Sequence, residues 1–263
     1  MSAIAGGAVS SFLMIAVAVT AFAGCRRLTR VSTRWFLAGA AVWLLAVVLK
    51  FVCAILFNQA VLAEIRRLSS APACQFAGAV FLGVESSLFE MGITLLAVMI
   101  WHRWGRPMAR AIAIGIGAGA FEALLVGGAA LASVTWAASG AAAAAEMRQA
   151  LSTFQHSTPL FWLVGPVERI IAILCHGASR ALILSGYARR TRWRIVGGFA
   201  LFALLDSVAG WIQLSGKMGT VSMWKLESAI IPVGILSAVV LVWLGMRDDR
   251  PYRNMPRNVE VPP

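Results

Sequence analysis

Long apolar stretches alternate with short polar connections along almost the whole chain. A helix needs about 20 predominantly apolar residues to cross a bilayer, and seven stretches meet that requirement. They cover residues 3–24, 36–57, 75–101, 109–136, 159–187, 195–214 and 228–246. The pattern predicts an all-α protein, a polytopic membrane bundle of about seven transmembrane helices that forms a single domain over residues 1–246.

Two segments fall outside this pattern. In the longest connection, 137–158, the apolar residues Met147, Leu151 and Phe154 recur at i, i+4 and i+7. This spacing predicts a short amphipathic helix lying on the membrane surface. Residues 247–263 form a basic tail with three prolines in its last eight positions and no apolar period, so we predict that the tail is disordered.

The composition excludes the soluble classes of protein. Hydrophobic residues make up 60% of the 263 positions and charged residues 13%, and the mean hydropathy is +0.80. A soluble domain is about half apolar and about a quarter charged, which rules out a cytosolic enzyme or a secreted toxin. The four cysteines, Cys25, Cys53, Cys74 and Cys175, form no CxxC pair and indicate neither a zinc knuckle nor a disulfide framework.

The net charge of +12 would suggest a nucleic-acid partner in a soluble protein. Here the connections 25–35, 102–110 and 188–194 and the tail hold fifteen of the 23 Lys and Arg residues. All of these segments lie on one side of the predicted bundle. The positive-inside rule therefore places the N-terminus outside and the C-terminus in the cytoplasm, so the expected partner is the lipid bilayer and not nucleic acid.

Ionisable residues inside the predicted spans are the main functional signal. Each charge at the bilayer centre costs roughly 2.5–3.5 kcal/mol on the insertion scale. The spans contain five acids and three bases: Glu85, Glu90, Glu122, Glu168, Asp206, Lys50, Arg169 and Arg180. Complete pairing still leaves two carboxylates over, and these must be protonated, bound to a metal or placed in a wet cavity.

Helical geometry groups several of these side chains. At 100° per residue, Arg169, His176 and Arg180 fall within about 40° of one another, and Glu168 lies at the edge of the same face. Asp206 stands alone in an apolar helix. We expect it either to pair with one of the two arginines or to belong to the same site.

The fourth span combines a small-residue seam with a carboxylate. Gly115 and Gly119 form a GxxxG pair, and Glu122 lies on the same face. Such a seam lets two helix backbones approach closely, so we expect Glu122 to contact another helix. In the third span Glu85 and Glu90 lie about 140° apart, which predicts that Glu90 faces inward while Glu85 pairs with Lys50 or lies near the outer surface.

Three stretches together resemble the YhfC family of intramembrane metalloproteases, which is related to the CAAX-protease and bacteriocin-processing membrane peptidases. They are SLFEMG at 87–92, GIGAGAFEA at 115–123 and VERIIAILCHGASRALILSGY at 167–187. The resemblance implies a helical protein of the bacterial cytoplasmic membrane, a peptide or membrane-protein substrate and a site built from Glu and His. It also implies a divalent metal, zinc in the first place, if the site is catalytic, and no other cofactor.

The resemblance assigns roles to individual residues. His176, Glu122 and Glu168 would be the metal ligands, and Glu122 and Glu168 would also act in catalysis. Arg169 would position a carboxylate or stabilise the oxyanion, and Glu90 or Asp206 would be the general base. The chain departs from the family pattern at three positions: Met91 replaces a second Glu after Glu90, Ala118 replaces a His, and Phe202 replaces the His four residues before Asp206.

Three functions remain open at this point. The first is an intramembrane peptidase that hydrolyses peptide bonds at the buried Glu/His site. The second is a pseudoprotease that binds a membrane partner without turnover. The third is an ion- or proton-coupled small-molecule transporter, because intramembrane acids also mark proton pathways.

Overall fold

Helices account for the regular secondary structure in the computed structural model, which describes residues 2–68, 70–217 and 220–248. In this part of the chain there are no strands, and six helical stretches are long and apolar enough to cross a membrane. They are α1 (Ala3–Thr29), α2 (Thr33–Cys53) with its extension to Leu68, α4 (Ala71–Ile100), α5 (Met108–Ala138), α7 (Val164–Ala188) with the turn before it, and α8 (Arg192–Leu214). The protein is therefore an all-helical integral membrane protein, as predicted.

The seventh predicted stretch, 228–246, is a shorter apolar helix. It forms α10 (Ile231–Asp248), which follows the five-residue helix α9 (Met223–Glu227). Of the tail that was predicted to be disordered, residues 249–263 lie outside the described part of the chain.

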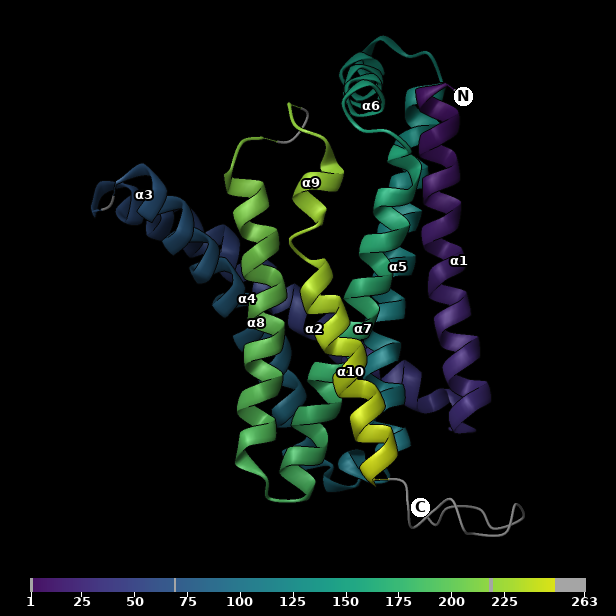
Figure 1. Cartoon of the computed structure of the whole chain (residues 1–263), viewed down its shortest axis with the longest axis vertical. Helices are drawn as coiled ribbons and strands as arrows, with labels where there is room; N and C mark the ends of the chain where they lie inside the picture. Colours follow the sequence, from purple (N-terminus) through teal and green to yellow (C-terminus); the bar gives the residue numbers. More distant parts are fainter. Residues whose placement is uncertain (1, 69, 218–219, 249–263) are drawn as a thin grey trace.

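The second span is longer than the hydropathy pattern predicted. After α2 the chain makes one π-helical turn, η1 (Ala54–Asn58), and continues directly as α3 (Gln59–Leu68). The prediction of a connection after residue 57 is wrong, because residues 54–68 contain no Gly or Pro to end the helix. α3 projects away from the other helices (Figure 1) and buries none of its side chains.

Short helices occupy the ends of the bundle. They are η2 (His102–Gly105), η3 (Ala142–Ala144), α6 (Ala145–Ser157) and η4 (Phe161–Leu163). The helix predicted around residues 147–154 is confirmed as α6, which lies at the same end of the bundle as the start of α1 (Figure 1).

Helix α7 is the central element of the fold. Eighteen of its 25 residues are buried, and it packs against α1, α4, α5, α8 and α10. The start of α1 and the end of α10 lie at opposite ends of the bundle (Figure 1). Any polar side chain on α7 is consequently placed among several other helices rather than in lipid.

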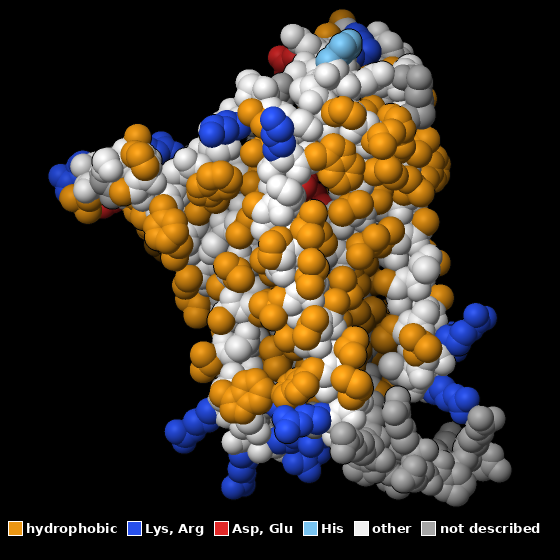
Figure 2. All heavy atoms as spheres, viewed as in Figure 1, with side chains coloured by type: hydrophobic (Ala, Val, Ile, Leu, Met, Phe, Trp, Pro, Cys, Tyr) orange, Lys and Arg blue, Asp and Glu red, His pale blue; other side chains and the backbone are white. Residues whose placement is uncertain are grey.

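The surface has the character expected of a membrane protein. Figure 2 shows hydrophobic side chains along the length of one face and Lys and Arg gathered at the two ends, with many at the end where α7 connects to α8. The four cysteines are free thiols, in agreement with the absence of a disulfide framework in the sequence.

Candidate functional site

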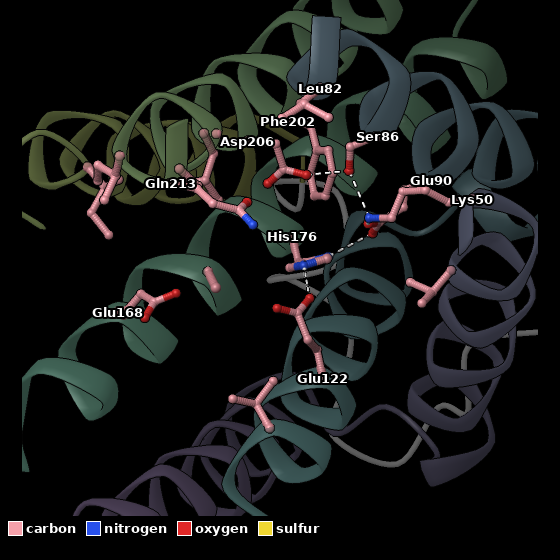
Figure 3. Close-up of a pocket in the computed structure, with 18 of the residues that line it drawn as sticks. Lys50, Leu82, Ser86, Glu90, Glu122, Glu168, His176, Phe202, Asp206 and Gln213 are labelled. Atoms are coloured by element: carbon pink, nitrogen blue, oxygen red, sulfur yellow. Dashed lines mark hydrogen bonds and ion pairs between the residues drawn. The ribbon is translucent and has the colours of Figure 1, made fainter. Parts of the chain in front are cut away.

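A polar cavity of about 750 Å³ lies among α2, α4, α5, α7 and α8, with α9 at its edge. Its lining includes all five acids of the predicted spans together with three of the basic or imidazole groups: Glu85, Glu90, Glu122, Glu168, Asp206, Lys50, Arg169 and His176. Figure 3 shows several of these side chains projecting from different helices into one space, with Glu168 set apart from the rest.

Close packing of α5 on α7 brings Glu122 and His176 together. A Cβ atom added to Gly115 would lie 2.7 Å from the carbonyl oxygen of His176, and one added to Gly119 would lie 2.8 Å from the Cα atom of Ile173. Only glycine permits this approach of the two backbones. As the spacing predicted, Glu122 on the same face contacts the neighbouring helix.

His176 is held from both sides of its ring. Its Nε2 lies 2.6 Å from Glu122 Oε2, and its Nδ1 is hydrogen-bonded to Nη1 of Arg180. A guanidinium group can only donate, so Nδ1 accepts and the ring proton on Nε2 is donated to Glu122. The ring of His176 also packs edge-to-face with that of Phe202, with the ring centroids 5.0 Å apart.

Arg180 connects His176 to the third span. Its side chain is fully buried, and Nη2 donates to Glu90 Oε2 over 3.0 Å. The other oxygen of Glu90 accepts from Nζ of Lys50 at 2.8 Å. Glu90 therefore faces inward, as predicted, and it is neutralised by two cations from two different helices.

The chain of contacts continues to α8 through a serine. Lys50 Nζ also donates to Ser86 Oγ at 2.9 Å, and Ser86 donates in turn to Oδ2 of Asp206. Asp206 consequently belongs to the same site and is bound to Ser86 rather than to Arg169 or Arg180.

At the opposite end of the network, Arg169 lies between two carboxylates. Nη1 donates to Glu122 Oε1 at 2.5 Å, and Nη2 donates to Oε1 of Glu168. One continuous series of hydrogen bonds thus joins five helices. In order, its members are Glu168, Arg169, Glu122, His176, Arg180, Glu90, Lys50, Ser86 and Asp206.

The two surplus acids inferred from the sequence can now be identified. Glu90, Glu122 and Glu168 form ion pairs with the three bases. Asp206 instead accepts from Ser86, and Glu85 Oε2 accepts from Asn58 Nδ2 at 2.8 Å. The two acids of the cavity without a basic partner are therefore Asp206 and Glu85.

One of the two alternatives given for Glu85, pairing with Lys50, is wrong. Glu85 is bonded to Asn58, while Lys50 pairs with Glu90. Glu85 and Glu90 both line the cavity despite their angular separation.

Sequence reasoning also missed neutral and peripheral members of the site. Three uncharged polar side chains line the cavity: Asn58, Ser86 and Gln213. Glu227 lines it from α9 and lies just before the predicted span 228–246. Ser86 lies four residues before Glu90 and so shares its face, which is a signal that could have found it. Burial raises the pKa of the Glu227 carboxyl to about 7; Glu168 adds to the rise and Arg169 opposes it.

The donor set does not fit a catalytic zinc site in this arrangement. Such a site uses three protein ligands and an open fourth position. In the described part of the chain, no group of three or more His, Cys, Asp and Glu side chains is placed to hold a metal ion. Of the expected ligands, His176 and Glu122 are in contact, whereas Glu168 is bonded to Arg169 and lies apart (Figure 3).

Comparison with known proteins gives one match. The family model described as YhfC intramembrane metalloprotease matches residues 13–227. Comparisons with the curated proteins and with the solved structures gave no match. The matched range covers most of the chain and contains every member of the hydrogen-bonded series.

We predict that Arg180→Met lowers the free energy of unfolding by about 3–5 kcal/mol, the range for breaking one side of a buried ion pair. Glu90 would lose one of its two cations and His176 its donor. Unfolding of the full chain in detergent micelles measures the loss. The control is Arg67→Met on α3, which breaks the exposed pair with Glu64 and should cost less than about 1 kcal/mol. Equal losses in the two variants would contradict the role given to Arg180.

We also predict that Glu227 makes the protein less stable as the pH rises. The folded carboxyl has a pKa of about 7, above its unfolded value, so the folded state binds the proton more tightly and stability is lost as the pH rises towards 7. After allowance for partial exposure, the melting temperature of the wild type should fall by about 2–4 °C relative to Glu227→Gln between pH 5 and pH 8. Parallel melting curves across this range would contradict the prediction.

Proposed function

The chain belongs to the YhfC intramembrane metalloprotease family, and we propose that it uses its membrane-embedded cavity to bind a segment of another membrane protein without metal-dependent cleavage. The observation that carries the proposal is the environment of His176, whose two ring nitrogens are taken by Arg180 and Glu122. A metal ligand needs a free imidazole lone pair, and here the Nδ1 lone pair accepts from a guanidinium.

The residues around His176 support the same conclusion. Phe202 stands where the family pattern has a His, and its ring packs against His176. The other two histidines, His102 and His156, lie in η2 and α6 and do not line the cavity. A second imidazole is therefore missing from the position at which a zinc ligand would be expected.

Fixed positive charge also disfavours a dication at this place. Arg169, Arg180 and Lys50 neutralise Glu90 and Glu122, the two carboxylates that contact His176. A metal ion beside His176 would need the same carboxylate oxygens that already accept hydrogen bonds from these three cations, and it would have to displace them.

The cavity suits a binding function. Its volume falls within the range of about 300–1,000 Å³ that is common for ligand sites. Phe51 on α2 and Val126 on α5 line the cavity and are 65% and 39% exposed, which opens the cavity to the outside of the bundle. A segment in the bilayer can thus reach the cavity sideways, and the two acids without a basic partner, Asp206 and Glu85, favour a segment with a basic or hydrogen-bond-donating side chain.

The finer topology is part of this proposal. With 18 residues, α10 is about 27 Å long at 1.5 Å per residue, close to the hydrocarbon thickness of about 30 Å. We infer that it makes the seventh crossing. The N-terminus then lies outside and the C-terminus in the cytoplasm, which agrees with the clustering of Arg at the α7–α8 end.

The decisive experiment combines metal content with binding and cleavage of a defined peptide. The purified full chain, loaded with zinc and desalted, should retain far less than one zinc per molecule, and His176→Gln should not change the amount. His156→Gln controls for adventitious binding at an exposed imidazole. About one zinc per chain, lost only in His176→Gln, would overturn the metal-independent assignment.

The peptide is a Leu/Ala transmembrane helix with one central Lys, reconstituted with the protein in nanodiscs. It should bind saturably and remain intact. Ala172→Trp, which fills the cavity from α7, should weaken binding at least tenfold, while Ile170→Trp on the lipid-facing side of the same helix should not. Cleavage of the peptide, or equal binding by both variants with unchanged melting temperatures, would refute the proposed function.

A further inference from the structure

A second cavity lies on the lipid-facing side of the bundle, away from the polar site. Helices α8 and α10 both pack on α7 but make few contacts with each other, which leaves a groove of about 430 Å³ between them. Its walls are formed by Leu204 on α8 and by Leu236 and Val240 on α10. Nine residues line the groove; one is Gly197, and the other eight have aliphatic or aromatic side chains.

Two tryptophans close one end of this groove. The rings of Trp193 on α8 and Trp243 on α10 lie 5.7 Å apart between centroids and are tilted by 56°. Tryptophan is enriched at the boundary between lipid chains and headgroups, because its indole ring is apolar and its N–H group is polar. The groove therefore ends at the depth where a headgroup would begin.

Arginines are held against the same two rings. The guanidinium carbon of Arg194 lies 5.7 Å from the ring centroid of Trp193 and 5.2 Å from that of Trp243, and that of Arg247 lies 5.4 Å from Trp243. These cation–π contacts fix positive charge at the end of the groove.

The segment beside the tryptophans adds further positive charge. The connection RRTRWR, residues 189–194, contains four arginines and no acid, and Arg192 in it is exposed. Arg247 is also exposed and is followed in the sequence by two aspartates and Arg250, so the combined segments keep a net positive charge. Figure 2 shows Lys and Arg side chains directly below the hydrophobic surface at this end of the molecule.

We propose that the groove between α8 and α10 binds one acyl chain of an anionic phospholipid, whose phosphate lies against Arg192 and Arg247. An apolar groove within a bilayer is filled by hydrocarbon, and guanidinium groups bind phosphate oxygens with charge-assisted hydrogen bonds. The juxtaposition of an apolar groove, interfacial tryptophans and exposed arginines matches the two halves of such a lipid. This site is separate from the polar cavity and does not depend on the function proposed for that cavity.

Gly197 provides a selective way to fill the groove. A Cβ atom at this position meets no atom closer than Leu182 Cδ1 at 3.9 Å, so Gly197→Leu is accommodated and its side chain occupies the lipid's place. Gly128 on α5 is a matched control, because a Cβ atom there meets nothing within 4 Å and the position is exposed elsewhere on the bundle.

Native mass spectrometry of the full chain with equal amounts of phosphatidylglycerol and phosphatidylcholine of the same acyl composition tests the site. The wild type should retain one phosphatidylglycerol in preference to phosphatidylcholine. Gly197→Leu should reduce that retention at least fivefold, and Gly128→Leu should leave it unchanged. Equal retention by the two leucine variants would overturn the groove assignment.

The charged half of the site is tested separately. Arg192→Gln with Arg247→Gln should remove the preference for phosphatidylglycerol over phosphatidylcholine while leaving the melting temperature unchanged in the absence of added lipid. A preference that survives the double substitution would overturn the headgroup assignment. Inorganic phosphate at the same concentration should not displace the lipid or raise the melting temperature; if it does either, the site binds free phosphate and the lipid proposal fails.

Discussion

A charged side chain buried in a membrane bundle must be neutralised by a partner, and the packing of the central helices here follows from that requirement. Arg180 is fully buried on α7 and can remain there because α4 supplies Glu90. Glu90 in turn requires that Lys50 on α2 lie within hydrogen-bond distance. The positions of α2, α4 and α7 are thus fixed by two ion pairs, and removing either partner would leave an uncompensated charge. The polar site thus helps to position the same helices whose apolar side chains form the core.

The sequence was sufficient to predict six of the long membrane helices and the identity of most polar residues that line the cavity, for a common physical reason. Lipid imposes a fixed thickness on every crossing and a high cost on every charge, so both signals are visible without knowledge of the fold. The ends of the helices were less predictable, because residues 54–68 lack a residue that ends a helix and the chain remains helical beyond the expected boundary.

The pairing of the charges could not be predicted from the sequence. It depends on the rotation and depth of each helix relative to its neighbours, and these are set by contacts between residues far apart in the chain. Lys50 was one of two alternatives for Glu85 but pairs with Glu90, and Asp206 is hydrogen-bonded to Ser86. Ser86 and Asn58 were not predicted as members of the site. A neutral polar side chain costs little free energy in a transmembrane helix and is common there because it serves helix packing.

The π-helical turn η1 has a consequence for how the cavity is completed. Lys50 and Asn58 are eight residues apart and would point about 80° away from each other on a regular α-helix. The wider i→i+5 turn over Ala54–Asn58 winds less per residue, and both side chains line the cavity. The one extra residue in this turn therefore rotates the residues after it about the helix axis relative to those before it. It brings a polar side chain to Glu85 without altering the face that α2 presents to Glu90.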